Sequence, residues 1–270
     1  MNTPPETALD DAALRRLIQP AAELALDYAR RRERLGVDLK SPGQFVSEAD
    51  RAVEVAIRAA LAEAFGPVPI LGEEAGGGLD ADGSGWAIDP IDGTTNFLRG
   101  LPLWGVSAGL MARGAPIAGI VVLPELGLTL TAQHGRGTVV NGVALPAGLG
   151  SAVGLIALGE NGFEPGASTD ARAERYRRRC YTVVRYNCAV FSLANVALGR
   201  LDGYVENGCS LWDIAAAGLI CREAGVVVDV RRRSDGQYSI VALQKKRAES
   251  FFLGGPIQYG SVLWQFRRRR

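Results

Sequence analysis

The chain has 270 residues with 30 basic and 29 acidic side chains, so its formal net charge is +1. This balance argues against a protein that is held to nucleic acid or to an anionic membrane by bulk charge. Hydrophobic residues make up 47% of the chain, which excludes a disordered chain and is enough for a sizeable core in one large domain or two closely packed halves.

The N-terminal segment and the cysteines indicate where the protein is expected to reside. Residues 1–11 contain acids and prolines where a secretory signal has basic residues followed by an apolar run. Arg113 and Glu125 interrupt the most apolar region, residues 101–130, so no membrane span is predicted. The cysteines, at positions 180, 188, 209 and 221, form no C-x-x-C pair. We therefore expect a cytoplasmic protein with reduced thiols, no zinc site and no membrane partner.

The first part of the chain is predicted to be helical. Residues 12–34 place apolar side chains on one side at helical spacing, and Pro20 is expected to kink this helix or to divide it in two. A second amphipathic helix is predicted over residues 48–65, opened by Ser47 and closed by Gly66 and Pro67. Short β-type runs separated by glycine turns follow it. They cover residues 68–71, 86–89, 104–111, 117–123 and 128–132.

From about residue 154 strand and helix patterns alternate. Strands are predicted over residues 155–158, 182–186, 203–206 and 226–230, and helices over residues 169–179, 190–198 and 211–224. This alternation predicts a mixed α/β sheet covered by helices. A boundary near residue 150 separates an N-terminal α+β half, residues 1–150, from a C-terminal α/β half, residues 151–270. Both halves are expected to contribute to one cleft in one compact unit.

Acidic residues follow the ends of two predicted strands. Residues 59–98 contain seven acids and no Lys or Arg. Three of these acids, Glu73, Asp89 and Asp92, come directly after an apolar run, where open sheets present side chains to a cleft. Carboxylates that converge there repel one another and need a neutralising cation. Oxygen ligands suit hard divalent cations, so the sequence predicts a magnesium site.

The segment Asp89-Pro90-Ile91-Asp92 supports this interpretation. Pro90 has a fixed φ and keeps Asp89 extended, so that two carboxylates and the Ile91 carbonyl can face one point. Taken alone, the tetrapeptide is also consistent with a simple turn. The residues that follow, Gly-Thr-Thr-Asn, supply backbone amides and hydroxyls at a predicted helix start. Together they predict a metal site beside an anion site.

Two further acids have an ordinary structural explanation. Asp213 stands in the first turn of a predicted helix, where the helix dipole stabilises an acid. Ser47 and Asp50 form a capping-box pattern with Asp in place of Glu. Local rules therefore account for both acids without a functional role, and the pattern alone leaves the two explanations open.

Three separated pieces of the chain resemble the inositol monophosphatase family, a group of magnesium-dependent, lithium-sensitive phosphomonoesterases. The pieces are Gly72-Glu73-Glu74, residues 86–97 (WAIDPIDGTTNF) and residues 211–218 (LWDIAAAG). The resemblance covers the chain from about residue 40 to residue 228. It implies a layered αβαβα sandwich of the sugar-phosphatase type, a phosphoric monoester hydrolase, and a homodimer.

The resemblance also implies a set of metal ligands. Glu73, Asp89 and the Ile91 carbonyl look like the ligands of one magnesium ion, and Asp89, Asp92 and Asp213 like those of a second, with Asp89 as the bridge. Four carboxylates and two dications sum to zero charge, so a phosphate dianion can approach without net repulsion.

Catalytic and substrate-binding roles follow from the same resemblance. Thr94 and Asp50 are similar to the hydroxyl and carboxylate that orient and deprotonate the attacking water in the family. The amides of Gly93 and Thr94 would cradle the phosphate. Glu206 occupies the position that binds a hydroxyl of the inositol ring. The implied substrate contacts are Ile91, Asp92, Gly93, Thr94, Ala189 and Glu206.

Two departures from the family pattern leave the substrate and the number of metals open. Asn187-Cys188-Ala189 stands where many relatives have Gly-Ser/Thr-Ala, and Gln44 stands where many have an acid near a third metal. We expect two or three Mg²⁺ ions and a small phosphorylated metabolite, first myo-inositol 1-phosphate. Fructose 1,6-bisphosphate, histidinol phosphate and 3′-phosphoadenosine 5′-phosphate are the alternatives.

A protein of a different class is the remaining hypothesis. The arginine runs at residues 177–179, 231–233 and 267–270 could serve an RNA or transcription accessory protein. No aromatic residues are interleaved with these runs, and solvated helix ends explain them, so a nucleic-acid partner is not expected.

Overall fold

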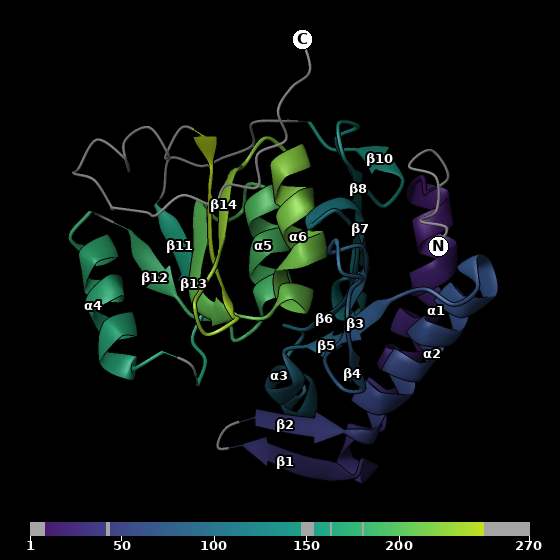
Figure 1. Ribbon diagram of the computed structural model, residues 1–270. Helices are drawn as coiled ribbons and strands as arrows, with labels where there is room; N and C mark the ends of the chain where they lie inside the picture. Colours follow the sequence, from purple (N-terminus) through teal and green to yellow (C-terminus); the bar gives the residue numbers. More distant parts are fainter. Residues whose placement is uncertain (1–8, 42–43, 147–153, 163, 180, 246–270) are drawn as a thin grey trace.

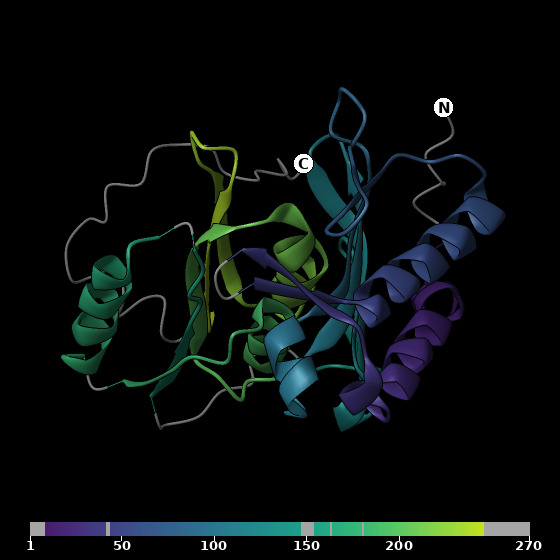
Figure 2. The same ribbon diagram turned by 90° about the horizontal axis from the view of Figure 1, so that it is seen from below.

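Helices and sheets stack in five layers in this computed structural model, which describes residues 9–41, 44–146, 154–162, 164–179 and 181–245. Figure 1 shows their order: one helix, a five-stranded sheet, two central helices, an eight-stranded sheet and two outer helices. Seen from below in Figure 2, the two outer helices pack side by side against the large sheet. The αβαβα sandwich predicted from the sequence is therefore confirmed.

The outer helices are α1 (Asp11–Ala29) and α2 (Glu48–Phe65). Helix α1 begins at Asp10, whose carboxylate accepts a hydrogen bond from the Ala13 N–H at 2.8 Å. It continues past Pro20, so this proline does not divide the helix, and a kink there, the other predicted outcome, stays a prediction. Proline removes one backbone donor, and the buried apolar face of α1 on both sides of it keeps the helix together. A short turn, η1 (Arg32–Arg34), follows α1.

The large sheet is built almost entirely of hairpins. Its strands are β3 (Ile70–Gly72), β4 (Gly76–Gly77), β5 (Gly85–Asp92), β6 (Gly105–Ala112), β7 (Ala115–Leu123), β8 (Leu128–Gln133), β9 (Thr138–Val140) and β10 (Val143–Ala144). Their order is β10-β9-β8-β7-β6-β5-β3-β4, and β3 and β5 form its one parallel pair among the described residues. Helix α3 (Thr94–Arg99) follows β5, and the turn η2 (Pro124–Leu126) follows β7.

The smaller sheet is mixed. Its strands are β11 (Leu155–Leu158), β12 (Thr182–Val184), β13 (Gly203–Cys209), β14 (Val227–Arg232) and β15 (Tyr238–Leu243). Their order is β12-β11-β13-β15-β14, with β15 antiparallel to both of its neighbours. Its helices are α4 (Gly166–Arg177), α5 (Ala189–Ala197) and α6 (Leu211–Glu223). Strand β15 was not predicted, although it lies inside the sheet.

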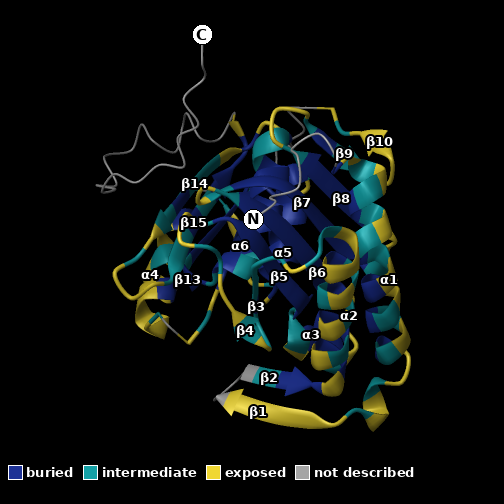
Figure 3. Ribbon diagram, turned by 45° about the vertical axis from the view of Figure 1, so that its right-hand side comes forward, coloured by how far each residue is buried: buried dark blue, intermediate teal, exposed yellow. Residues whose placement is uncertain are grey.

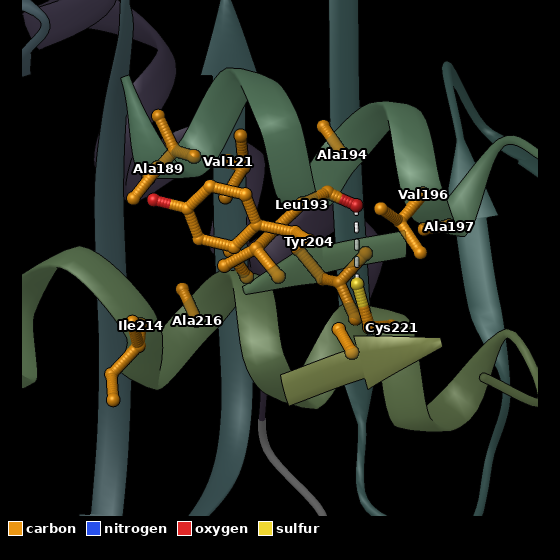
Figure 4. Close-up of a cluster of buried hydrophobic side chains, with 14 of the residues drawn as sticks. Val121, Ala189, Leu193, Ala194, Val196, Ala197, Tyr204, Ile214, Ala216 and Cys221 are labelled. Atoms are coloured by element: carbon orange, nitrogen blue, oxygen red, sulfur yellow. Dashed lines mark hydrogen bonds between the residues drawn. The ribbon is translucent and has the colours of Figure 1, made fainter. Parts of the chain in front are cut away.

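Helices α5 and α6 form the layer between the two sheets. Every residue of α5 is buried, because both of its sides are covered. Figure 4 shows side chains of α5 and α6 packed with Val121 of β7 and Tyr204 of β13, and the hydrogen bond from the Cys221 thiol to the Leu193 carbonyl. This thiol is a buried packing group, which agrees with the prediction of free cysteines. Cys180 lies outside the described residues.

Glycines on the large sheet allow α6 to approach it closely. A Cβ atom at Gly119 would lie 2.9 Å from the Ala216 Cα, and one at Gly109 would lie 2.8 Å from the Ala216 N. In contrast, a Cβ at Gly218 on α6 would meet its nearest neighbour, the Ile240 Cδ1, at 3.8 Å. The contact between α6 and the sheet therefore depends on bare backbone at positions 109 and 119.

We expect Gly119→Ala to lower the free energy of unfolding by about 1–3 kcal/mol, because the added methyl group forces the helix away from the sheet. Gly218→Ala is the matched control: it has room, and replacing a helix-interior glycine is expected to stabilise the protein by about 0.5–1 kcal/mol. Urea denaturation of both variants measures these changes. A Gly119→Ala variant as stable as the Gly218→Ala variant would contradict the close approach.

Two strands form a small separate sheet. The antiparallel hairpin of β1 (Val37–Ser41) and β2 (Gln44–Ser47) lies between α1 and α2 in the chain and was not predicted. Figure 3 shows β1 as an exposed strand beneath the buried body of the protein. The hairpin brings Lys40 and Phe45 to the pocket described below.

The two large sheets are drawn from residues 70–144 and 155–243. The predicted boundary near residue 150 falls in residues 147–153, which lie outside the described part of the chain, so the two halves remain a prediction. None of the described helices combines the length and apolar character needed to cross a membrane.

Candidate active site

The parallel pair β3 and β5 brings the first acids together. Gly72 lies beside Ile88 at the last pair of these two strands, so Glu73 and Asp89 both come directly after the paired segment, where β3 ends and β5 continues to Asp92. The pairing of β5 with β6 is irregular between Asp89 and Asp92. Pro90 lies in this interval and has no N–H to donate, and such irregularities redirect side chains.

A pocket of about 710 Å³ lies beside these acids and is lined by segments from both sheets. Six acids line it: Glu73, Asp89, Asp92, Glu160, Glu206 and Asp213. Of the described residues in its wall, Lys40 is the sole cation. The other predicted site residues in the wall are Ile91, Gly93, Thr94 and Ala189. Asp50 is fully buried and lies behind the wall.

Asp89 has a buried carboxylate oxygen without a hydrogen-bond partner. One of its oxygens, Oδ1, accepts a hydrogen bond from the Ile91 N–H at 3.0 Å. The other, Oδ2, is buried without a hydrogen-bond partner. Burial raises the pKa of Asp89 well above its usual range, and repulsion from Glu73, Asp92 and Asp213 adds to the shift. A buried, unpartnered carboxylate oxygen among like charges is suited to a cation.

Asp92 and Asp213 are each held by a backbone amide from a helix start. The Asp92 Oδ2 accepts from the Val190 N–H of α5 at 2.6 Å, and the Asp213 Oδ2 accepts from the Ser210 N–H at the start of α6 at 2.7 Å. Burial raises the pKa of Asp92 to about 7, although the bond from Val190 opposes the shift. Burial also raises the pKa of Asp213 well above its usual range, with repulsion from Asp92 as the next cause.

Asp50 caps α2 and also contacts a residue of the pocket wall. Its Oδ2 accepts from the Ser47 N–H at 2.8 Å and from the Ser47 hydroxyl at 2.6 Å, which completes the capping box of α2. Its Oδ1 lies 3.0 Å from the Thr94 Oγ1. Burial raises the pKa of Asp50, against the lowering effect of its bonds to Ser47 and Thr94. Because Thr94 lines the pocket, Asp50 reaches the pocket through the Thr94 hydroxyl.

The Thr94 hydroxyl has two acceptors within reach and one proton to give. Besides Asp50, the Ile91 carbonyl lies 3.1 Å from the Thr94 Oγ1. A hydroxyl donates one hydrogen bond at a time and accepts others. This arrangement can move a proton from the pocket side of Thr94 to the buried carboxylate of Asp50.

Lys40 was not predicted as a site residue. Its Nζ lies 3.1 Å from the Glu73 Oε1 and 2.5 Å from the Glu74 Oε1. Burial disfavours the charge on Lys40, but the two carboxylates outweigh it and raise the Lys40 pKa. Burial raises the pKa of Glu74 to about 7. The contact joins β1 to a turn 33 residues later, and no local pattern indicates it.

The far side of the pocket holds Glu206 with its donors. The Glu206 Oε2 accepts from the Tyr204 hydroxyl at 2.5 Å, and its Oε1 accepts from the Asn161 side-chain amide at 2.8 Å. A Cβ at Gly159 would lie 2.4 Å from the Glu206 carboxyl carbon, so the carboxylate lies directly against bare backbone. The Cys188 thiol contacts both the carbonyl and the Oδ2 of Asp92 at 3.4 Å.

The carboxylate and carbonyl oxygens of the pocket are suitable ligands for a hard divalent cation, although they do not surround a single point. No group of three or more described His, Cys, Asp and Glu side chains is placed to hold one metal ion as it stands. Asp92 and Asp213 are each held by a backbone amide instead. The buried Asp89 Oδ2, which has no hydrogen-bond partner, and the oxygen donors around it are of the kind that a hard divalent cation prefers.

The five-layer fold and its acidic pocket at strand ends and helix starts define a phosphatase of the layered α/β type. The model of the inositol monophosphatase family matches residues 9–251. The chain therefore belongs to the inositol monophosphatase family, and it is a phosphoric monoester hydrolase of that family. Members of this family are in general metal-dependent.

Individual relatives agree with this assignment. The chain is 37% identical to an inositol-1-monophosphatase of Mesorhizobium japonicum over 203 residues, covering 72% of this chain and 74% of the relative. It is 36% identical to the Nus factor SuhB of Pseudomonas aeruginosa, covering 79% and 82%. The crystal structure of the extragenic suppressor protein suhB from Bartonella henselae matches with a TM-score of 0.77 and 30% identity, covering 87% and 93%.

Proposed function

We propose that this chain is a Mg²⁺-dependent phosphomonoesterase that hydrolyses the monophosphate of a small polyol, with myo-inositol 1-phosphate as the first candidate. The observation that carries the proposal is the buried and unpartnered Asp89 Oδ2 in a pocket that also contains Glu73, Asp92 and Asp213. Such a cluster is costly for a fold unless a cation neutralises it.

The residues divide into metal ligands and proton carriers. Glu73, Asp89, Asp92, Asp213 and the Ile91 carbonyl would hold two Mg²⁺ ions, which when bound supply positive charge to the phosphate and its leaving oxygen and acidify water. A third ion stays a prediction, because the Gln44 side chain lies outside the described part of the structure.

Thr94 and Asp50 would remove the proton of the attacking water. The Thr94 hydroxyl takes this proton while its own proton passes to the Asp50 Oδ1, 3.0 Å away. The Asp50 Oδ2 stays bound to Ser47, so the carboxylate keeps its position during the transfer. The backbone amides of Gly93 and Thr94 would orient the phosphate, and Ala189 also lines the pocket.

The wall around Glu206 disfavours a leaving group that carries negative charge. Glu160, Asn161 and Glu206 line this part of the pocket and offer acceptor oxygens to hydroxyl donors. The single cation of the described wall, Lys40, is already paired with Glu73 and Glu74. A second phosphate on the substrate would meet carboxylates without a described cation to balance it. A monophosphate of a polyol therefore fits better than a bisphosphate.

We expect kcat/KM for myo-inositol 1-phosphate to exceed that for fructose 1,6-bisphosphate and 3′-phosphoadenosine 5′-phosphate by about ten-fold or more, or ~1.4 kcal/mol of transition-state binding. Phosphate release with Mg²⁺ measures this preference, and histidinol phosphate is assayed as the fourth candidate substrate. The same assay with added lithium tests the lithium sensitivity expected of the family. A bisphosphate that is the best of the four substrates would contradict the acceptor role of the Glu206 wall.

A second function is the RNA or transcription accessory role that the arginine runs raise, and we consider it because several relatives are named Nus factor SuhB and not inositol-1-monophosphatase. The described arginine runs give it little support, because Arg178, Arg231 and Arg233 each pair with an acid on their own segment. Residues 267–270 lie outside the described chain. Salt-dependent RNA binding that survives Asp89→Asn, together with no phosphate release by the unmodified protein, would favour this second function.

A homodimer in the cytoplasm belongs to the same proposal and rests on family membership. Light scattering of the purified protein measures the mass of the assembly, and a monomer at micromolar concentration would remove the dimer from the proposal.

A further inference from the structure

One face of α2 carries three charged residues at intervals of one helical turn. Asp50, Glu54 and Arg58 are spaced four residues apart, so their side chains point the same way. Asp50 contacts Thr94, after β5. Glu54 and Arg58 contact the turn between β3 and β4, which carries Glu73. The same helix face therefore touches both segments that supply the acids of the large sheet.

Glu54 binds the backbone of the turn with both carboxylate oxygens. Its Oε2 accepts from the Glu74 N–H at 2.7 Å, and its Oε1 accepts from the Ala75 N–H at 3.1 Å. These two amides directly follow Glu73. Glu54 is 1% exposed, so water cannot replace the carboxylate as their acceptor.

Arg58 completes the contact from the next turn of the helix. Its Nε lies 2.8 Å from the Glu54 Oε1, and its Nη2 donates to the Gly76 carbonyl at 2.7 Å. The guanidinium thus neutralises the buried carboxylate and holds the end of the same turn. Together, Glu54 and Arg58 bind backbone groups of Glu74, Ala75 and Gly76.

The pair on α2 also lies directly against the start of the turn. A Cβ at Gly72 would lie 2.4 Å from the Glu54 Oε1 and 2.7 Å from the Arg58 Nη2, so a side chain there would displace both groups from their hydrogen bonds. The glycine of the Gly72-Glu73-Glu74 motif therefore lets the buried pair reach the turn.

We propose that Glu54 and Arg58 are positioning residues that hold the turn so that Glu73 faces Asp89 and can bind Mg²⁺. This inference rests on the proposed function. Neither residue lines the pocket, so both act through the backbone of the turn.

The test compares Glu54→Gln with Glu63→Gln, an exposed position on the same helix. The amide of glutamine offers one acceptor oxygen where the carboxylate offers two, so one of the two turn N–H groups loses its partner. We expect the peptide covering residues 70–78 to exchange its amide hydrogens about ten-fold faster in metal-free Glu54→Gln. We expect its affinity for Mg²⁺ alone, measured by calorimetry, to fall about 10–100-fold.

A rate measurement separates positioning from general destabilisation. The variant is expected to recover most of its phosphate release at saturating Mg²⁺, because every ligand is still present. A purely structural Glu54 would lower the melting temperature and leave the Mg²⁺ affinity of the folded protein unchanged. Arg58→Gln provides a second variant with a milder expected loss, about three- to ten-fold in Mg²⁺ affinity. If Glu54→Gln does not fold, the same measurements are made on Arg58→Gln.

Unchanged exchange of the turn, or a Mg²⁺ affinity within about three-fold of the unmodified protein, would overturn the positioning role. Failure of the unmodified protein to bind Mg²⁺ would instead overturn the proposed function. The two failures are distinguishable, because the exchange experiment uses no metal.

Discussion

The variant Asp213→Asn is expected to lose about a thousand-fold in phosphate release at saturating Mg²⁺, which corresponds to ~4 kcal/mol of transition-state stabilisation. Asparagine has the shape of aspartate but lacks its charge, so one of the proposed metal sites would lose its anionic ligand. The four-carboxylate set would then no longer balance two dications.

The fold is expected to survive this change. The Asp213 side chain caps α6 by accepting from the Ser210 N–H, and the carbonyl oxygen of asparagine can accept the same bond. In the metal-free protein the variant also removes one buried charge from a repelling cluster. Its metal-free melting temperature should therefore equal or exceed that of the unmodified protein.

Phosphate release and thermal unfolding without metal measure both effects. Asp27→Asn is the control, because Asp27 is 63% exposed on α1 and pairs only with a neighbouring arginine among the bonds described for it. A near-normal rate in Asp213→Asn would refute the two-metal proposal. A large drop in metal-free stability would show that Asp213 serves mainly as a helix cap.

The variant Thr94→Val is expected to lower kcat by about 10²–10⁴-fold with little change in Mg²⁺ affinity. Valine keeps the branched shape of threonine and removes the hydroxyl that joins the pocket to the Asp50 Oδ1. Asp50 keeps its two bonds to Ser47, so the start of α2 stays in place. The fall in kcat would therefore reflect slower removal of the proton from the attacking water.

Thr94→Ser is the matched control, since it keeps a hydroxyl at the same atom and is expected to retain most of the rate. Adding Asp50→Asn to Thr94→Val should cost little more than either change alone, because the two residues act on one proton. Steady-state rates over a range of Mg²⁺ concentrations provide the comparison. Independent, multiplicative losses would argue against a shared proton path.

Much of the fold could be predicted from local patterns. The amphipathic helix over residues 48–65 and the strands around residues 86–89 and 117–123 were predicted with nearly their observed bounds. Strand β15 was missed, although its pairing with β13 and β14 places it inside the small sheet. Its position depends on partners that are distant in the sequence. Pro20 does not divide α1, because tertiary packing of its buried face outweighs one lost hydrogen bond.

The candidate site was predictable where motifs follow strand ends. Glu73, Asp89 and Asp92 share a pocket because β3 and β5 are parallel neighbours. Lys40 and Glu54 were not predicted, because their contacts with the Glu73 turn span 33 and 20 residues and depend on a hairpin and a helix face. The proposed roles of the site residues remain predictions.

The Asp92 carboxylate and the Val190 amide that binds it are separated by 98 positions along the chain. Asp213, which lines the same pocket, comes later still in the sequence. A nascent polypeptide on the ribosome therefore cannot complete this pocket before Asp213 has been synthesised. If these acids act as proposed, phosphate release requires that segments from both sheets have folded together.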